Sequence, residues 1–135
     1  MILTIDTFAW IEIIRGSPLG KRAKDLLEGS DRCITPSIVL AEVASKRVSD
    51  GASDLAIRNE LTAIREASEV FPISETVAML GARATVELRQ AAHSARLQIP
   101  GLADGLVLAT ARAAHSKLLT GDPHFRSLPE TLWLS

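Results

Sequence analysis

The chain has 135 residues but only one cysteine, Cys33, no tyrosine, and 4% aromatic residues in total. A single cysteine can form neither an internal disulfide nor a cysteine-rich zinc cluster. So few aromatic side chains exclude base stacking as the main means of holding a nucleic acid. Neither sign of charge dominates, with 15 basic against 16 acidic residues, so a polyanion must be held by a local basic patch or by bound cations.

The sequence also lacks long hydrophobic runs. Its longest stretch without Asp, Glu, Lys or Arg covers residues 33–41, which is much shorter than the ~18 apolar residues of a membrane span. We therefore expect no membrane association. Residues 1–6 lack the basic region and apolar core of a secretory signal, which predicts a cytoplasmic protein. The length and the 47% of hydrophobic residues fit one folded domain over residues 1–135.

Short apolar segments alternate with longer segments of helical periodicity along the chain. Strands are predicted at residues 2–5, 33–35, 70–73, 117–120 and 131–134. Helices are predicted at about residues 7–14, 19–27, 37–48, 54–68, 75–96 and 102–114. This alternation is typical of an α/β layer sandwich built around a parallel sheet.

Two acidic residues follow predicted strands at the point where a parallel sheet binds its ligands. Asp6 comes directly after residues 2–5, and Asp122 follows residues 117–120 and Gly121. Ligands of open parallel sheets bind beyond the carboxyl ends of the strands. If these two strands are neighbours, the two carboxylates converge. The alternative is that each Asp caps the helix that follows it.

Two further acidic residues stand among apolar neighbours in predicted helices. Glu42 lies within residues 38–44, and Asp104 lies near the start of the most apolar helix. A charge in such surroundings is costly unless it has a partner. Glu42 has an alternative as half of an ion pair with Lys46, one helical turn away. Asp104 has an alternative as a first-turn acid that favours the helix dipole.

These four carboxylates repel one another if they share a poorly solvated pocket, because they cannot all stay ionised without compensation. No Lys or Arg lies directly beside any of them in sequence, and Lys46 is one helical turn from Glu42. A hard divalent cation supplies the missing positive charge, since Mg²⁺ prefers oxygen ligands and usually binds one or two carboxylates plus waters. The pattern therefore indicates a metal-assisted reaction at a phosphate group.

The chain resembles the PIN-domain ribonucleases, and specifically the small VapC-type toxins of toxin-antitoxin systems, over nearly its whole length. The resemblance rests on Asp6-Thr7 after the first strand, on Glu42, and on the more specific segments 103–111 (ADGLVLATA) and 119–125 (LTGDPHF). It implies a single PIN domain over residues 1–135, a three-layer α/β sandwich with a central parallel sheet of about five strands flanked by helices. It also implies endonucleolytic RNA cleavage that leaves 5′-phosphate and 3′-hydroxyl ends.

The resemblance assigns roles to the acidic residues. It implies four carboxylates that act in catalysis and metal binding: Asp6, Glu42, Asp104 and Asp122. Asp6 and Asp104 would be the principal ligands of Mg²⁺ or Mn²⁺, and a water activated there would hydrolyse the RNA phosphodiester. Thr7 and Thr120 would orient carboxylates or water by hydrogen bonds. Gly121 departs from the family pattern, in which many members have a polar residue at this place.

The resemblance also implies partners: an RNA substrate, a cognate antitoxin that packs into a groove beside the acidic pocket, and a second copy of the chain in a homodimer. For RNA contacts we favour Arg15 and Arg126 among the basic residues, because each follows an element that leads away from the acidic residues. Trp10, in the apolar first helix, suits either core packing or an interface.

Two alternative functions remain open from the sequence. One is a catalytically inactive PIN-like module that only binds protein or RNA. The other is a phosphotransfer receiver or a phosphatase with an aspartate nucleophile, which also places Mg²⁺ in an acidic pocket on a parallel sheet. That second class needs another acid next to the first Asp or two residues after it, where this chain has Thr7 and Phe8.

Overall fold

The computed structural model describes all of residues 1–135. It contains five strands: β1 (Ile2–Ile5), β2 (Arg32–Pro36), β3 (Glu69–Phe71), β4 (Lys117–Thr120) and β5 (Thr131–Trp133). Six α-helices and one short 3-10 helix connect them: α1 (Thr7–Arg15), α2 (Pro18–Glu28), α3 (Ser37–Ser49), α4 (Asp54–Ala67), α5 (Glu75–Ser94), α6 (Leu102–Ala113) and η1 (Pro123–Phe125). None of the helices combines the length and hydrophobicity of a membrane-spanning segment.

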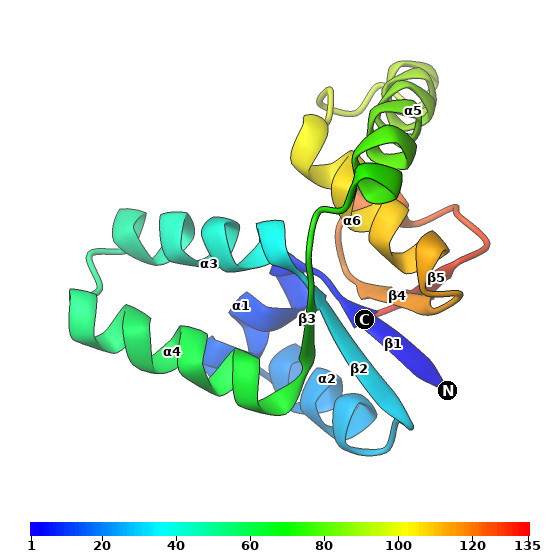
Figure 1. The fold of residues 1–135 in the computed structure, drawn as a ribbon. Coiled ribbons are helices and arrows are strands. Elements are labelled where there is room, and N and C mark those ends of the chain that lie inside the picture. The colour runs from blue at the N-terminus through cyan, green and yellow to red at the C-terminus, as the bar shows by residue number, and fades with distance from the viewer.

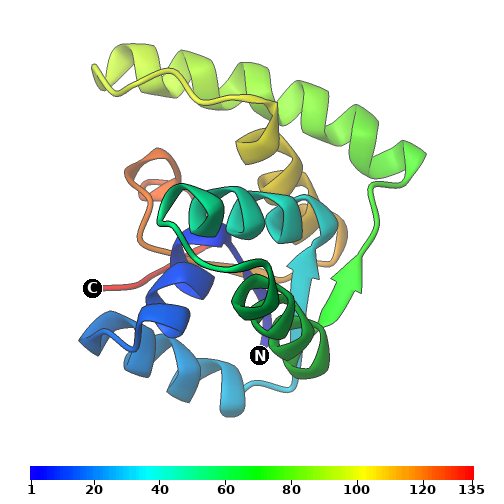
Figure 2. The ribbon, with the colours of Figure 1, turned by 90° about the vertical axis from the view of Figure 1, so that its left-hand side faces the viewer.

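All five strands are parallel and form one sheet in the order β3-β2-β1-β4-β5. Helices α1 to α4 pack on one side of the sheet, and α6 packs on the other with α5 laid against it (Figure 1). In the view turned by 90°, α5 extends along the edge of the molecule, away from α1 and α2 (Figure 2). The predicted fold class, a three-layer α/β sandwich with a five-stranded parallel sheet, is confirmed.

The strand order places a ligand-binding crevice between β1 and β4. From β1 the chain moves to β2 and β3 on one side, and it then crosses back to place β4 on the other side of β1. Thr4 pairs in register with Ile34 of β2 and Leu118 of β4. In open α/β sheets, the crevice beyond the carboxyl ends of strands at such a reversal is the usual ligand site. Asp6 and Asp122 both emerge there.

The central strands are buried on both faces, as expected for a parallel sheet. Leu3 and Ile5 of β1 and Leu118 and Leu119 of β4 are at most 1% exposed. Trp10 of α1 is also buried, and its indole N–H donates a hydrogen bond to the Thr35 hydroxyl at 3.1 Å. Core packing therefore accounts for Trp10, the first of the two roles predicted for it.

Two predicted boundaries are wrong by a few residues. The strand predicted at residues 70–73 covers Glu69–Phe71 instead, because Pro72 has no backbone N–H to continue the ladder. The helix predicted to reach residue 96 ends at Ser94, and Arg96 has a left-handed backbone with φ of 57°. A non-glycine residue in that conformation interrupts the α-helix.

The crossing of α5 and α6 fixes the position of the first turn of α6. A side chain on Gly105 would place its Cβ 1.9 Å from the Thr85 hydroxyl and 2.5 Å from the carbonyl oxygen of Gly81. Only glycine permits this close approach of the two helices. Because Gly105 directly follows Asp104, the same contact positions the backbone of that acidic residue.

Candidate active site

The four carboxylates predicted from the sequence line a single cavity of about 220 Å³ beyond the carboxyl ends of β1 and β4. They come from four separate segments: the residue after β1, the middle of α3, the first turn of α6 and the loop after β4. The other residues of the cavity wall are Thr7, Phe8, Val107 and Phe125. The structure therefore brings together acidic residues that are far apart in the sequence.

Asp6 has a structural role and also faces the cavity. Its backbone is extended, and its Oδ1 accepts a hydrogen bond from the N–H of Ala9 at 2.9 Å, so it caps α1. The side chain is almost completely buried, and this burial raises the pKa of Asp6 from 3.8 to about 7. Hydrogen bonds from Thr120 and Ala9 lower that pKa, whereas the charges of Asp122 and Glu42 raise it further.

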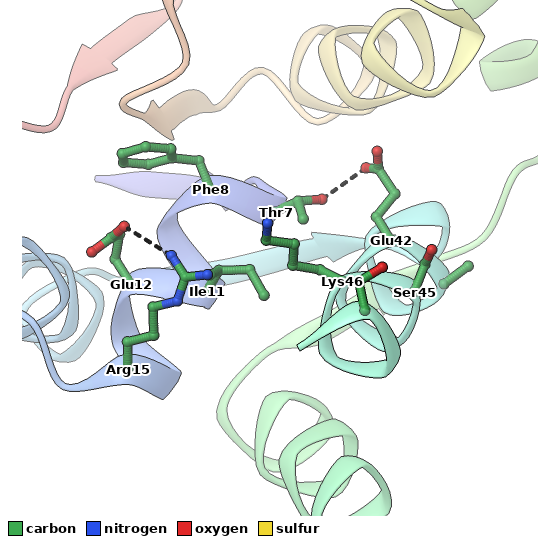
Figure 3. A pocket seen from close by; sticks show the side chains of 10 residues that line it. Thr7, Phe8, Ile11, Glu12, Arg15, Glu42, Ser45 and Lys46 are labelled. Atoms are coloured by element: carbon green, nitrogen blue, oxygen red, sulfur yellow. Dashed lines mark hydrogen bonds and ion pairs between the residues drawn. The ribbon is translucent and has the colours of Figure 1, made fainter. Parts of the chain in front are cut away.

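Glu42 is held by a threonine and not by the lysine that follows it. The Thr7 hydroxyl donates to Oε1 of Glu42 at 2.7 Å (Figure 3). No ion pair forms between Glu42 and Lys46, so the alternative role as half of a helical ion pair is wrong. Burial raises the pKa of Glu42, the Thr7 hydrogen bond lowers it, and the charges of Asp104 and Asp122 raise it.

Asp104 lies in the first turn of α6, as the sequence predicts, and is partly buried. Burial raises its pKa, and the negative charge of Asp122 adds to that effect. His124 and the backbone of Gly101 lower the pKa of Asp104. The favourable helix-terminal position is therefore outweighed by the loss of hydration and by the neighbouring acid.

Asp122 forms the end of a short hydrogen-bonded chain that crosses the site. Its Oδ1 lies 2.9 Å from Nδ1 of His124, and it also accepts the backbone N–H of His124 at 2.9 Å. Nε2 of His124 faces the carbonyl oxygen of Gln98 at 2.5 Å. Both ring nitrogens thus face acceptors, which favours the doubly protonated ring. Burial lowers the pKa of His124, but the Gln98 carbonyl and the charges of Asp122 and Asp104 outweigh it and raise the pKa.

Thr120 links the two acidic residues that follow the central strands. Its Oγ1 accepts the backbone N–H of Asp122 at 2.9 Å, and its hydroxyl hydrogen bond lowers the pKa of Asp6. Thr7 and Thr120 therefore both form hydrogen bonds with carboxylates of the cavity.

The donor set of the cavity suits a hard divalent cation. All four acidic side chains offer carboxylate oxygens, and His124 is the only basic side chain that forms an ion pair with any of them. No three His, Cys, Asp or Glu side chains are arranged to hold a metal ion together. This arrangement fits an ion such as Mg²⁺, which commonly binds through one or two carboxylates and keeps several waters.

The two arginines favoured for RNA binding have different positions. Arg15 lines a larger groove of about 680 Å³ between α1 and α3, which shares Thr7, Phe8 and Glu42 with the acidic cavity (Figure 3). The guanidinium of Arg126 instead lies over the ring of Trp133, 4.8 Å from its centroid, and lines neither hollow. The structure thus brings Arg15, but not Arg126, next to the acidic residues.

Two features of the site were not predicted from the sequence. A side chain on Gly121 would place its Cβ 2.3 Å from the ring of Phe8, so Gly121 makes room for the ring that borders both hollows. The second feature is the contact of His124 with Gln98, which ties the loop before α6 to Asp122. A glycine between Thr120 and Asp122 is a sequence signal for the close approach of the Phe8 ring. Nothing in the sequence indicates which backbone carbonyl His124 would contact.

Comparison with protein-family models matches residues 3–130 to the PIN domain. The chain belongs to the PIN-domain family. Membership supports a nuclease role, and so a hydrolase activity, for this PIN domain, and PIN nucleases generally use divalent metals. A search of curated proteins found no match.

Solved structures of toxin-antitoxin proteins have the same fold as this PIN domain. VapBC2 from Rickettsia felis, bound to a promoter DNA fragment, has a TM-score of 0.74 at 22% identity, covering 98% of this chain and 97% of that one. A toxin-antitoxin complex from Klebsiella pneumoniae has a TM-score of 0.71 at 21% identity, with 98% of each chain covered. VapC20 from Mycobacterium tuberculosis, a Sarcin-Ricin loop cleaving toxin, has a TM-score of 0.70 at 16% identity, with 94% and 95% covered.

Proposed function

We propose that this PIN domain is a metal-dependent endoribonuclease of the VapC type, with Asp6, Glu42, Asp104 and Asp122 as its catalytic and metal-binding carboxylates. One observation carries the proposal: four acidic residues from distant segments line one cavity, and burial raises the pKa of three of them. Burying carboxylates in this way costs stability, and that cost is offset when the cavity holds a cation.

Asp6 and Asp104 would be the principal ligands of Mg²⁺ or Mn²⁺, with Glu42 and Asp122 completing the site directly or through water. When bound, such an ion lowers the pKa of a water molecule and neutralises the negative charge that develops on the phosphodiester. The capping bond from Ala9 fixes one oxygen of Asp6, and the contacts of His124 fix one oxygen of Asp122. The second oxygen of Asp122 accepts no hydrogen bond from the protein, whereas Asp6 also receives one from Thr120.

Glu42 is the side chain best suited to position the attacking water and accept its proton. Thr7 binds Oε1 of Glu42, whereas Oε2 accepts no hydrogen bond from the protein. The raised pKa of Glu42 makes it a stronger base than an exposed glutamate. A water held at Oε2 would attack the phosphorus in line, and cleavage would leave 5′-phosphate and 3′-hydroxyl ends. We propose that the protein acts in the cytoplasm, where it would meet its RNA substrate.

We also propose that the chain binds a cognate antitoxin. Several structures with this fold are toxin-antitoxin complexes, among them VapBC-1 from nontypeable Haemophilus influenzae. A mainly apolar cavity of about 580 Å³ lies between α1, α2 and α4, and Ile13, Ile14 and Leu27 are among the residues that line it. This cavity shares no residue with the acidic cavity, so it offers an apolar partner segment a place apart from the groove beside the acidic pocket that the resemblance implies.

A homodimer is the second assembly that we propose. Of the eleven exposed large hydrophobic residues, seven lie between residues 73 and 102, on α5 and the segments beside it.

We expect Met79→Lys, which places a charge in this patch, to convert a dimer to a monomer in sedimentation equilibrium. Leu55→Lys on α4 is the matched control, since Leu55 is even more exposed but lies outside the patch. A dimer that survives Met79→Lys unchanged contradicts an interface on α5.

The nuclease proposal predicts that divalent cations control RNA cleavage. Purified protein, freed of any bound antitoxin, is incubated with total cellular RNA in Mg²⁺ or Mn²⁺ and in EDTA. We expect discrete products with 5′-phosphate ends in the presence of the cations and none in EDTA, because the four carboxylates alone repel an RNA phosphate. Restoring Mg²⁺ should restore cleavage. A folded protein that cuts nothing with either cation but still binds a partner chain supports the inactive binding module instead.

A further inference from the structure

The groove between α1 and α3 continues outward from the acidic cavity and carries two basic side chains. It shares Thr7, Phe8 and Glu42 with the cavity, while Lys46 and Arg15 line its outer part (Figure 3). We propose that this groove binds the RNA backbone, with phosphates adjacent to the cleaved one held by Lys46 and then by Arg15. This inference rests on the proposed nuclease function and adds to it the path of the substrate strand.

Lys46 stands on the same face of α3 as Glu42, one turn further along the helix. Four residues of α-helix rise by about 6 Å, so the ammonium group lies a short step from the cavity and can contact the phosphate next to the reacting one. Lys46 is exposed, and it donates no hydrogen bond and forms no ion pair within the protein. Its charge attracts Asp50 only at longer range, and its ammonium group is therefore available to a ligand that enters the groove.

Arg15 lies further out, in the last turn of α1, about two turns from Thr7. It forms two long ion pairs, with Glu12 at 3.9 Å and with Asp50 at 3.6 Å, and both distances exceed that of a hydrogen bond. Asp50 is already bound by Arg47 at 3.1 Å. The guanidinium of Arg15 thus keeps its N–H donors available, and this fork suits the paired oxygens of a phosphate.

Two other arginines, Arg47 on α3 and Arg112 on α6, hold structural partners, in contrast to Lys46 and Arg15. Arg47, the residue after Lys46, donates to both carboxylate oxygens of Glu60 and to Asp50. Arg112 is bound by Glu87 and Glu130. Those pairs stabilise contacts between elements, whereas the cations of the groove hold no structural partner by a hydrogen bond. A role in binding an external anion accounts for this difference.

The wall of α3 offers neutral donors between the two cations. Ser45 and Ser49 are exposed, line the groove one helical turn apart, and form no side-chain hydrogen bond within the protein. Hydroxyl groups of this kind commonly contact phosphate oxygens and fix the register of a strand without reading its sequence. The one acid in the outer groove, Glu12, accepts a hydrogen bond from the Ser17 hydroxyl at 2.5 Å. The outer groove therefore favours an anion, in contrast to the acidic cavity.

The test separates RNA binding from RNA cleavage. Binding of a short single-stranded RNA of mixed sequence is measured by fluorescence anisotropy, with Mg²⁺, in an Asp104→Asn background at several KCl concentrations. Lys46→Gln and Arg15→Gln should each weaken binding by about threefold to tenfold at low salt. Each should also reduce the slope of log K against log salt by about 0.7, the loss of one phosphate contact on a single strand. Lys21→Gln on α2, an exposed lysine outside the groove, is the matched control.

Kinetics of the protein with Asp104 intact provide a second readout. Lys46→Gln and Arg15→Gln should raise KM for RNA with little change in kcat, because the contacts are equal in the ground and transition states. Unchanged affinity and unchanged salt slope in both variants would overturn the groove assignment while leaving the nuclease proposal in place. A wild-type protein that neither binds nor cleaves RNA overturns the nuclease proposal and this inference together. If Lys46→Gln and Arg15→Gln lose antitoxin binding but keep RNA binding, the groove binds the antitoxin, and the proposed path of the RNA is overturned.

Discussion

Replacing Asp104 by Asn should reduce RNA cleavage by about a thousandfold or more while the protein stays folded. The substitution keeps the size of the side chain and removes a carboxylate proposed as a principal metal ligand. The Asp104 carboxylate is hydrogen-bonded only by the backbone of Gly101, which an asparagine can also bind, and burial already raises its pKa, so we expect the neutral amide not to weaken the fold. The measurement is kcat/KM for RNA cleavage, with circular dichroism and a thermal melt on the same sample.

A matched control distinguishes this effect from a general loss of charge. Asp25 is an exposed aspartate on α2 outside the acidic cavity, and Asp25→Asn should leave cleavage within about twofold of wild type. Asp6→Asn should lose activity as Asp104→Asn does, and asparagine retains the capping bond that Asp6 makes. Near-normal cleavage by a folded Asp104→Asn protein would remove Asp104 from the proposed machinery.

The second large effect is a pH dependence of stability in the metal-free protein. Between about pH 4 and pH 7 the native state holds a proton on Asp6 that the unfolded chain has released, because the pKa of Asp6 is about 7 when folded and 3.8 as its ordinary value. The native state then binds more protons than the unfolded state, so the free energy of unfolding falls as pH rises. This contribution, roughly 4 kcal/mol, is fully present below about pH 4 and is lost as pH rises through about 7.

The other groups of the site act in the same direction. The pKa values of Glu42 and Asp104 are raised mainly by burial, and that of His124 is raised by its acceptors. Exposed carboxylates paired with arginines, such as Glu69 with Arg32, have lowered pKa values and lose their contribution only at lower pH. Thermal and urea unfolding in EDTA should therefore show a more stable protein at about pH 5 than at about pH 8.

Metal binding and Asp6→Asn provide the controls for this prediction. Saturating Mg²⁺ at about pH 8 should restore stability, because a cation that binds only the native state adds about 2.7 kcal/mol at a hundred times its Kd. Asp6→Asn should make the pH profile in EDTA less steep, since its amide does not titrate while Glu42, Asp104 and His124 still do. A profile that stays flat for the wild type would show that the carboxylate of Asp6 is hydrated or compensated in the native state.

Periodicity and composition were sufficient to predict the layers of the molecule. The apolar residues 2–5 and 117–120 lack a helical period, and both form buried parallel strands. Asp6 and Asp122 were recognised because each breaks the apolar pattern at the end of a strand. The spacing of apolar residues within one short segment indicates whether that segment is a strand or a helix and which of its residues are buried. This information is contained in the local sequence.

The sequence did not predict which groups the individual side chains bind. The sequence places Lys46 one turn from Glu42, but the structure pairs Glu42 with Thr7, which is thirty-five residues away. It likewise joins His124 to the carbonyl of Gln98 across the site. These choices depend on which helices pack together, and a local pattern carries no information about that packing.

The sequence by itself determined a parallel α/β fold and four acidic residues too costly to bury without a partner. The tertiary structure decided that they meet, because β4 lies beside β1 and because Gly105 lets α6 approach α5 closely. It also placed Arg15 and Lys46 in a groove that continues from the acidic cavity, and Arg126 on Trp133. The physical reason is that strand order and helix crossing depend on contacts between distant residues, whereas the sequence pattern reports burial and backbone conformation one segment at a time.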